Sequence, residues 1–251
     1  MTTPKLRRFV IGDIHGNFQG LLDLLSLLNL NSSDQIYFLG DLIDRGPDSS
    51  KVVDFVMDEG HICLLGNHEQ MMVLALANLS PNSPVLQMWL QAGGKKTLES
   101  YNSQEHLWKH LSWLKSLPNY LDLGDFWLVH AGIHPDIPLE LQTDQEFCWI
   151  RREFHNMSKP YFANKTIITG HTMTFTFAEV EPGQIVQGAG WLGIDTGAYH
   201  PHSGWLTALD ISSLTVYQIN ILTGDSRIKP LSEVVVPLQY GKNSSQMPMS
   251  S

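Results

Sequence analysis

The chain has 251 residues, of which 43% are hydrophobic, 10% aromatic and 16% charged, and this composition is typical of one compact globular domain with a substantial core. Its net charge of −9 argues against non-specific binding to nucleic acid or to an anionic membrane surface.

Neither a membrane span nor a disulfide framework is predicted. No apolar run approaches the roughly 18 residues that a membrane span requires. The N-terminal segment enters an apparent strand at once and lacks the pattern of a signal peptide. Cys63 and Cys148 lie in apolar surroundings, so we expect both to pack in the core. These features predict a cytoplasmic protein without a membrane partner.

Short apolar runs alternate with helical patterns in the first half of the chain. The expected strands are 8–11, 35–39 and 61–65, and the expected helices are 17–30, 49–59 and 69–78. Such alternation is typical of βαβ units and a largely parallel sheet. Residues 84–117 read as helical throughout, with Leu107, Leu111 and Leu114 at helical spacing.

The second half changes character. Apolar runs at 126–129 and 166–169 predict two strands, and a meander of β-runs at 192–194, 204–211 and 214–220 is expected to pack against the first sheet. The polar segment 239–251 is expected to be a disordered tail, which leaves residues 1–238 as one domain.

Five apolar runs end in Asp, His or Asn beside glycine. The motifs are GDIHG (12–16), GDLIDRG (40–46), GNHE (66–69), HAG (130–132) and GH (170–171). One strand-end Asp is ordinarily a turn or cap residue, and one such His a packed side chain. Five together, at the strand ends where ligand crevices form in α/β sheets, point to a shared site. Oxygen and imidazole donors without a thiolate suit Mn, Fe or Zn, and two ions sharing a carboxylate suit phosphoryl hydrolysis.

In this order the five motifs resemble the phosphoprotein phosphatase family of metallophosphoesterases. The segments GNHEQMM and WIRREF are especially similar to small bacterial and phage enzymes such as the lambda-type serine/threonine protein phosphatase. The resemblance implies an α/β four-layer sandwich of two mixed β-sheets flanked by helices. It also implies two divalent ions, with Mn expected and Fe or Zn as alternatives. The implied ligands are Asp13, His15 and Asp41 for the first ion, and Asp41, Asn67, His130 and His171 for the second.

The resemblance assigns substrate and proton roles as well. Arg45 and Arg151 would bind the substrate phosphate together with Asn67 and His68, and Arg152 is a poorer candidate than Arg151. His68 would protonate the leaving group, with Asp44 accepting its other ring N–H. The implied reaction is direct attack on phosphorus by a metal-bridging hydroxide.

Other conspicuous side chains are expected to have ordinary structural roles. Glu69 is expected to cap the helix that follows it, and Asp195 and Tyr199 to shape the wall of the site. We expect Lys95 and Lys96 to be solvated and Trp89, Trp108 and Trp113 to lie in the core. His134, His200 and His202 are expected on surface loops, with any role in the substrate cleft left open.

The sequence leaves three functions open. The first is a phosphatase acting on phosphoserine or phosphothreonine, and conceivably phosphotyrosine, in proteins or peptides, as a monomer. The second is a symmetrical diadenosine-tetraphosphatase, a group that tends to lack the Asp of the DRG triplet and to carry GNHD. The third is a non-catalytic binding module, against which the complete ligand set argues. Asp44 and Glu69 favour the first hypothesis.

Overall fold

The computed structural model describes residues 6–77, 80 and 83–238. The expected tail at 239–251 and Asn78, the last residue of an expected helix, lie outside the described residues. In the described part of the chain, no helix is both long and apolar enough to cross a membrane.

The order of elements confirms the alternation expected for the first half. The strands are β1 (Arg8–Ile11), β2 (Gln35–Phe38), β3 (Ile62–Cys63), β4 (Tyr120–Asp122), β5 (Phe126–Val129), β6 (Thr166–Thr169), β7 (Ile185–Gly188), β8 (Trp191–Gly193), β9 (Trp205–Asp210), β10 (Thr215–Asn220), β11 (Ser226–Pro230) and β12 (Val235–Pro237). The helices are α1 (Phe18–Leu28), α2 (Ser49–Asp58), α3 (Asn67–Ala77), α4 (Pro84–Trp89), α5 (Lys95–Ser100), α6 (Gln104–Leu114), α7 (Asp144–Trp149), α8 (Arg152–His155) and α9 (Leu231–Val234).

The first sheet has the strand order β11-β10-β9-β1-β2-β3. Strands β1, β2 and β3 are parallel, as the βαβ pattern predicts, with Val10 opposite Tyr37. Strands β9, β10 and β11 continue the same sheet in antiparallel fashion, with β9 bonded to β1. The expectation that 204–211 and 214–220 pack against the first sheet is therefore wrong, because these runs pair with its edge and extend it.

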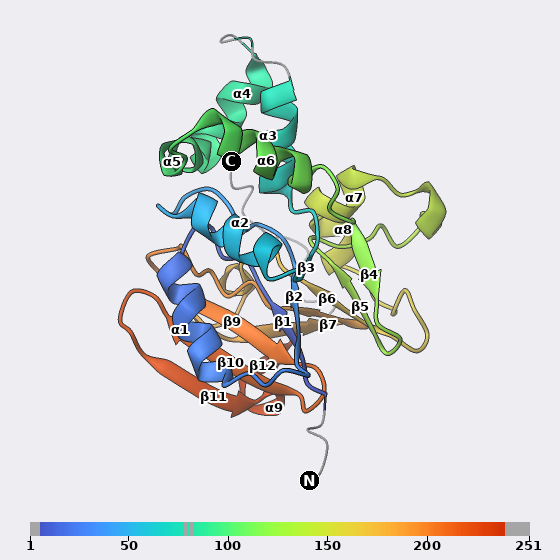
Figure 1. Cartoon of the computed structure of the whole chain (residues 1–251). Coiled ribbons are helices and arrows are strands. Elements are labelled where there is room, and N and C mark those ends of the chain that lie inside the picture. The colour runs from blue at the N-terminus through green and yellow to red at the C-terminus, as the bar shows by residue number, and fades with distance from the viewer. Residues whose placement is uncertain (1–5, 78–79, 81–82, 239–251) are drawn as a thin grey trace.

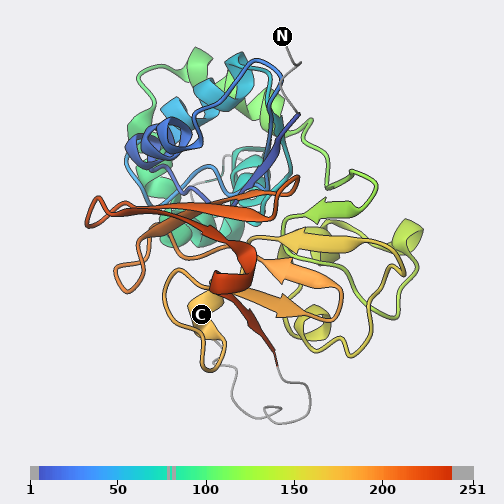
Figure 2. The ribbon, with the colours of Figure 1, turned by 90° about the horizontal axis from the view of Figure 1, so that it is seen from below.

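The second sheet has the order β12-β7-β8-β6-β5-β4, in which β5, β6 and β8 are parallel. The run expected at 192–194 thus forms a strand of the second sheet, whereas the two runs that follow it belong to the first sheet. Figure 2 shows the strands of the C-terminal third, orange to red, divided between the two sheets. The five motifs consequently come from two sheets, with three strand ends in the first and two in the second.

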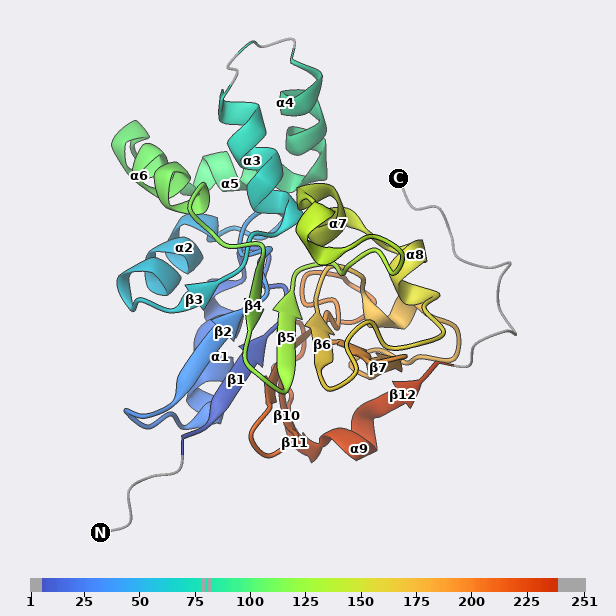
Figure 3. The ribbon, with the colours of Figure 1, turned by 90° about the vertical axis from the view of Figure 1, so that its right-hand side faces the viewer.

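Alternation along the strands explains the layers. Phe9 and Ile11 of β1 belong to the core shared with α1 and α2, whereas Val10 faces the core between the sheets. A third core covers the other face of the second sheet and includes Trp127 of β5 and Phe154 of α8. In Figure 3, α1 and α2 lie on the side of the first sheet and α7 and α8 on the side of the second. The expected fold of two mixed sheets flanked by helices is confirmed.

The segment 84–117 is helical as expected, but it is not continuous. A π-helical turn (Leu90–Gly94) joins α4 to α5, and the helices α3 to α6 gather at one end of the molecule (Figure 1). Trp89 is fully buried and Trp113 packs against the core, whereas Trp108 is 42% exposed. The prediction for Trp108 was wrong because about 100° of rotation per residue carries it away from the face of Leu111 and Leu114.

Both cysteines are buried free thiols, as expected for side chains that pack in the core. Lys95 and Lys96 are exposed as expected. The three loop histidines differ in exposure, since His202 is exposed while His134 and His200 are half-buried.

Candidate metal centre

The six side chains expected to bind metal are all buried and lie together where the strand ends of the two sheets meet. They are called the donor group below: Asp13, His15, Asp41, Asn67, His130 and His171. Asp41 follows β2 and stands at the centre of the group. One carboxylate oxygen lies 3.6 Å from His15 Nε2 and the other 3.4 Å from His130 Nε2. Asp41 therefore faces a histidine from each sheet, which is the placement that a bridging ligand requires.

The remaining donors close the group around Asp41. The side-chain oxygen of Asn67 lies 2.9 Å from His130 Nε2 and 2.8 Å from His171 Nδ1. The carboxylate of Asp13 accepts the backbone N–H of His171 over 3.0 Å. Strand ends that are far apart in sequence thus converge within hydrogen-bonding range of one another.

Hydrogen bonds fix the tautomers of two of these histidines. The Nδ1–H of His15 donates to the Ile43 carbonyl over 2.9 Å, and that of His130 donates to the Leu39 carbonyl over 2.9 Å. Each Nε2 consequently carries the lone pair that a metal ligand needs. Burial, reinforced by Arg45, lowers the pKa of His15 well below its ordinary value, so this ring is neutral.

The donor set fits divalent cations. Nε2 of His171 is buried and has no hydrogen-bond partner among the described residues. Nε2 of His130 and the Asn67 oxygen meet at 2.9 Å although both offer electron pairs, a contact that a cation would stabilise. Burial and the neighbouring carboxylates of Asp195 and Asp41 raise the pKa of Asp13 well above its ordinary value. A bound cation would reduce the repulsion among these neighbouring carboxylates.

His68 lies beside the donor group and in contact with Asp44. Its Nδ1 is 2.6 Å from Asp44 Oδ2, as the proposed proton donor and its carboxylate require. Its Nε2 is 3.9 Å from Asp41, so distance alone would also allow His68 in a cluster with His15 and Asp41. The division between ligand and proton donor therefore rests on the resemblance and on the Asp44 contact.

Asp44 is held by side chains that the sequence did not single out for this role. Trp89 Nε1 donates to both carboxylate oxygens, over 3.1 and 3.0 Å, and Thr97 Oγ1 donates over 2.6 Å. The backbone N–H of Asp44 is in turn bonded to Thr97 and Ser49. Trp89 is therefore a core residue, as expected, whose indole also positions the carboxylate behind His68.

Glu69 has a wider structural role than the expected cap. Its carboxylate accepts the backbone N–H of Gly66 before α3, which is the capping contact. It also accepts the N–H groups of Asp41, Leu42 and Ile43 over 2.8, 2.8 and 3.3 Å. Glu69 thus fixes the loop that carries the central carboxylate, and this role does not depend on the substrate.

The two candidate phosphate-binding arginines border the group on different sides. Arg45 Nη1 lies 2.8 Å from His15 Nε2, and the guanidinium stacks 3.9 Å from the ring centroid of Tyr199, so Tyr199 also borders the group. Arg151 Nη1 donates to the Thr172 hydroxyl over 2.8 Å and to the His171 carbonyl over 3.4 Å.

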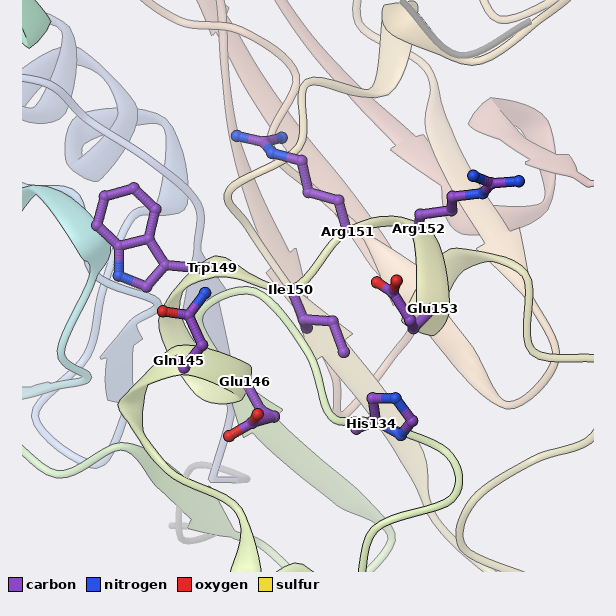
Figure 4. A pocket seen from close by; sticks show the side chains of 8 residues that line it. All are labelled: His134, Gln145, Glu146, Trp149, Ile150, Arg151, Arg152 and Glu153. Atoms are coloured by element: carbon purple, nitrogen blue, oxygen red, sulfur yellow. The ribbon is translucent and has the colours of Figure 1, made fainter. Parts of the chain in front are cut away.

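Beside Arg151 lies an open cavity of about 450 Å³. It is lined by His134, Gln145, Glu146, Trp149, Ile150, Arg151, Arg152 and Glu153. In Figure 4 the side chains of Arg151 and Arg152 leave the chain in different directions. Arg151 therefore borders both this cavity and the donor group, whereas Arg152 borders the cavity alone.

Backbone strain is concentrated at these positions. His15, Asp41, Asp44, Arg45 and His171 all have φ between 49° and 72°, a region that non-glycine residues seldom adopt. Such strain persists only where the surrounding structure enforces it, and it is frequent at functional sites. Gly93 allows the turn between α4 and α5 to approach Arg45, because a Cβ at this position would lie 2.7 Å from the Arg45 backbone nitrogen.

Comparison with known proteins agrees with this geometry. Residues 6–203 match the model of the calcineurin-like phosphoesterase family. Curated relatives named symmetrical bis(5'-nucleosyl)-tetraphosphatase include those of Photorhabdus laumondii (32% identity over 53% of this chain and 46% of the relative) and Edwardsiella ictaluri (34% over 62% and 53%). The chain thus spans about half the length of the curated relatives it matches.

Solved structures share the fold. One is a protein with a proposed diadenosine tetraphosphatase activity (TM-score 0.61, 23% identity, covering 92% of this chain and 96% of that one). Another is a metallophosphoesterase from Sphaerobacter thermophilus (TM-score 0.55, 20% identity, covering 82% and 84%). The curated relatives are named as nucleotide hydrolases rather than lambda-type protein phosphatases, so the narrower resemblance is not supported. The resemblance to metallophosphoesterases in general is supported. The chain belongs to the calcineurin-like phosphoesterase family.

Proposed function

We propose that this chain is a two-metal hydrolase of dinucleoside polyphosphates, which it cleaves symmetrically. The observation that carries the hydrolase assignment is the gathering of five other buried donors around Asp41, with a histidine at each of its oxygens. The substrate class is taken from the names of the curated relatives. It replaces the protein phosphatase as the leading hypothesis.

In this proposal Asp13, His15 and Asp41 hold one ion, and Asp41, Asn67, His130 and His171 hold the other. Such ions would activate a water molecule and stabilise charge on the phosphate. The chain's own contribution is to present neutral imidazoles and an ionised Asp41. Burial acts to raise the pKa of Asp41, but positive charge beside the carboxylate, which the rings of His130, His68 and His15 supply when protonated, lowers it.

A polyphosphate chain carries several negative charges, and the site offers arginines at more than one place along it. Arg45 would bind the phosphate under attack, and Arg151 the phosphate directed towards the cavity. The cavity, with Trp149 and Ile150 in its wall, would receive a nucleoside. Water would add to one of the two central phosphorus atoms as the central P–O bond breaks, giving two nucleoside diphosphates.

One observation keeps the protein phosphatase as a second candidate, with a phosphoprotein or phosphopeptide as substrate. His68 and Asp44 form a close pair, and a proton donor of this kind helps most when the leaving group is a poor one such as a serine alkoxide. Glu69 no longer separates the two candidates, because it binds backbone N–H groups around the metal-binding loop. The monomeric state and the cytoplasmic location stay predictions from the sequence.

The test is a comparison of kcat/KM for diadenosine tetraphosphate and a phosphoserine peptide, on one Mn²⁺-loaded preparation. p-Nitrophenyl phosphate serves as the control for general phosphoesterase activity. We expect the dinucleotide to be preferred and ADP to be its only nucleotide product. A preference for the peptide would favour the second candidate, and AMP with ATP would contradict symmetrical cleavage. No turnover of any substrate would contradict the hydrolase itself.

A further inference from the structure

A second cluster of metal-type donors lies between α2 and α6 and takes no part in the centre described above. It consists of Asp54 on α2 and of His106 and His110 on α6. His106 Nε2 lies 2.8 Å and His110 Nε2 2.9 Å from the same oxygen of Asp54, and the two nitrogens are 3.1 Å apart. The three donor atoms thus form a nearly equilateral triangle.

Spacing along the helix explains why the two rings meet. His106 and His110 are four residues apart, so they project from the same face of α6 on successive turns. Helices α2 and α6 lie side by side in both Figure 1 and Figure 3. Asp54 therefore meets both rings from the opposing helix, and the cluster joins two segments that are about fifty residues apart.

A hydrogen-bonded triad explains this geometry poorly. Each neutral imidazole has either a proton or a lone pair at Nε2. Two N–H groups directed at one oxygen would place two donors side by side, with their nitrogens 3.1 Å apart, and a lone pair on either nitrogen would face the lone pairs of the Asp54 oxygen. Ligand atoms about 2.0–2.2 Å from a common ion have edges of about 3–3.5 Å between them, which is close to the triangle observed.

The surroundings of His110 match those of a metal ligand. Its side chain has no exposed surface, and its Nδ1 lies 2.9 Å from the Tyr101 hydroxyl. If Nδ1–H donates to this hydroxyl, Nε2 carries the lone pair that faces the cluster, as ligating histidines commonly arrange. His106 and Asp54 are 31% and 36% exposed, so an ion and its remaining water ligands could enter from solvent.

We propose that Asp54, His106 and His110 form a third metal site, separate from the catalytic pair, which binds a transition-metal ion of the Zn²⁺ type. Two imidazoles and one carboxylate suit Zn²⁺, Ni²⁺ or Cu²⁺ better than Mg²⁺ or Ca²⁺, which prefer oxygen ligands. With three protein ligands, the ion keeps at least one position for water.

Other contacts near the cluster also hold α5 against α2. Ser49 contacts Thr97, and Ser50 bonds Ser100, both between α2 and α5. Asp54 lies one turn further along α2. A bound ion would therefore fasten α6 to α2 and stabilise the arrangement through which Thr97 reaches Asp44.

The experiment measures Zn²⁺ bound per chain by equilibrium dialysis and elemental analysis. Asp54→Asn and His106→Gln are compared with the wild type and with Asp58→Asn. Asp58 is the matched control, because it lies on the same helix and contacts Lys109 rather than the histidines. We expect the first two variants to bind one ion fewer than the wild type and Asp58→Asn to bind the full number. The thermal stabilisation by Zn²⁺ should shrink in the same two variants.

A further variant tests the positioning of His110. Tyr101→Phe removes the hydroxyl beside Nδ1 and should weaken the third site about 10–100-fold without abolishing it. Equal Zn²⁺ content in the wild type, Asp54→Asn and His106→Gln would overturn the proposal. An equal loss in Asp58→Asn would do so as well, since it would indicate general attraction to an acidic surface. Turnover with Mn²⁺ should be retained in all these variants, which also reports that they are folded.

Discussion

Replacing Thr97 by valine tests how Asp44 is held, because it removes one hydroxyl and keeps the branched shape. Thr97 Oγ1 donates to the carboxylate over 2.6 Å and accepts the Asp44 N–H over 2.8 Å, in a fully buried position. A hydrogen bond to a charged group contributes about 1.5–3 kcal/mol. In a chain of this size about 1 kcal/mol corresponds to about 2–4 °C, so Tm should fall by roughly 3–12 °C.

The assay is thermal unfolding at neutral pH, with Thr174→Val as the matched control. Thr174 is also fully buried, but its hydroxyl has no hydrogen-bond partner among the described residues. Removing that hydroxyl should leave Tm unchanged or raise it. Equal Tm changes in the two variants would refute the reasoning, because only one of the two hydroxyls supports a buried carboxylate.

Three further predictions concern the site and its surroundings. Arg151→Ala should weaken inhibition by inorganic phosphate by about 1.5–3 kcal/mol and Arg152→Ala much less, and the reverse order would mean that the wrong arginine has been assigned. His68→Asn should slow substrates with poor leaving groups about 10²–10⁴-fold while affecting p-nitrophenyl phosphate far less and leaving metal content intact; loss of metal would make His68 a ligand. Burial, and to a smaller extent the positive charge of Arg151, lowers the pKa of His155 to about 3. The unfolded chain therefore gains a proton on this residue below about pH 6.5, whereas the folded chain does not. Stability should therefore fall by up to about 1.4 kcal/mol per pH unit between pH 6 and 4, and His155→Phe should flatten this slope in melts recorded across that range; an unchanged slope would mean that His155 is not the group responsible.

The donor group could be predicted from sequence because each donor lies within a few residues of the end of an apolar strand, in a short motif that contains glycine. Parallel strands of one sheet end at the same edge, so Asp41 and Asn67 could be expected together. That His130 of the second sheet joins them followed only from the family resemblance, because apolar runs do not show how two sheets are placed. The positive φ angles at these positions have only a weak sequence signal. Asp and His adopt them more often than other non-glycine residues do, but most Asp and His residues do not, so His15 and Asp41 could not be singled out.

The support behind the proton donor could not be predicted in the same way. Trp89 and Thr97 lie in a helical segment some fifty residues after Asp44, and an indole at a helical position ordinarily indicates core packing. Only the glycine pair Gly93-Gly94 marks the place where this segment bends towards the site. The sequence pattern could not predict how the C-terminal strands divide between the two sheets either, because apolar alternation does not specify which strand pairs with which.

Turnover of p-nitrophenyl phosphate as a function of added Mn²⁺, starting from exhaustively chelated protein, tests the two-metal centre most directly. We expect no activity without metal, and a rise that reaches its plateau near two tightly bound ions per chain. Asp41→Asn, which alters the carboxylate between His15 and His130, should lose most activity and bind both ions weakly. Undiminished turnover by the metal-free wild type, or full activity of Asp41→Asn with normal metal content, would contradict the two-metal centre.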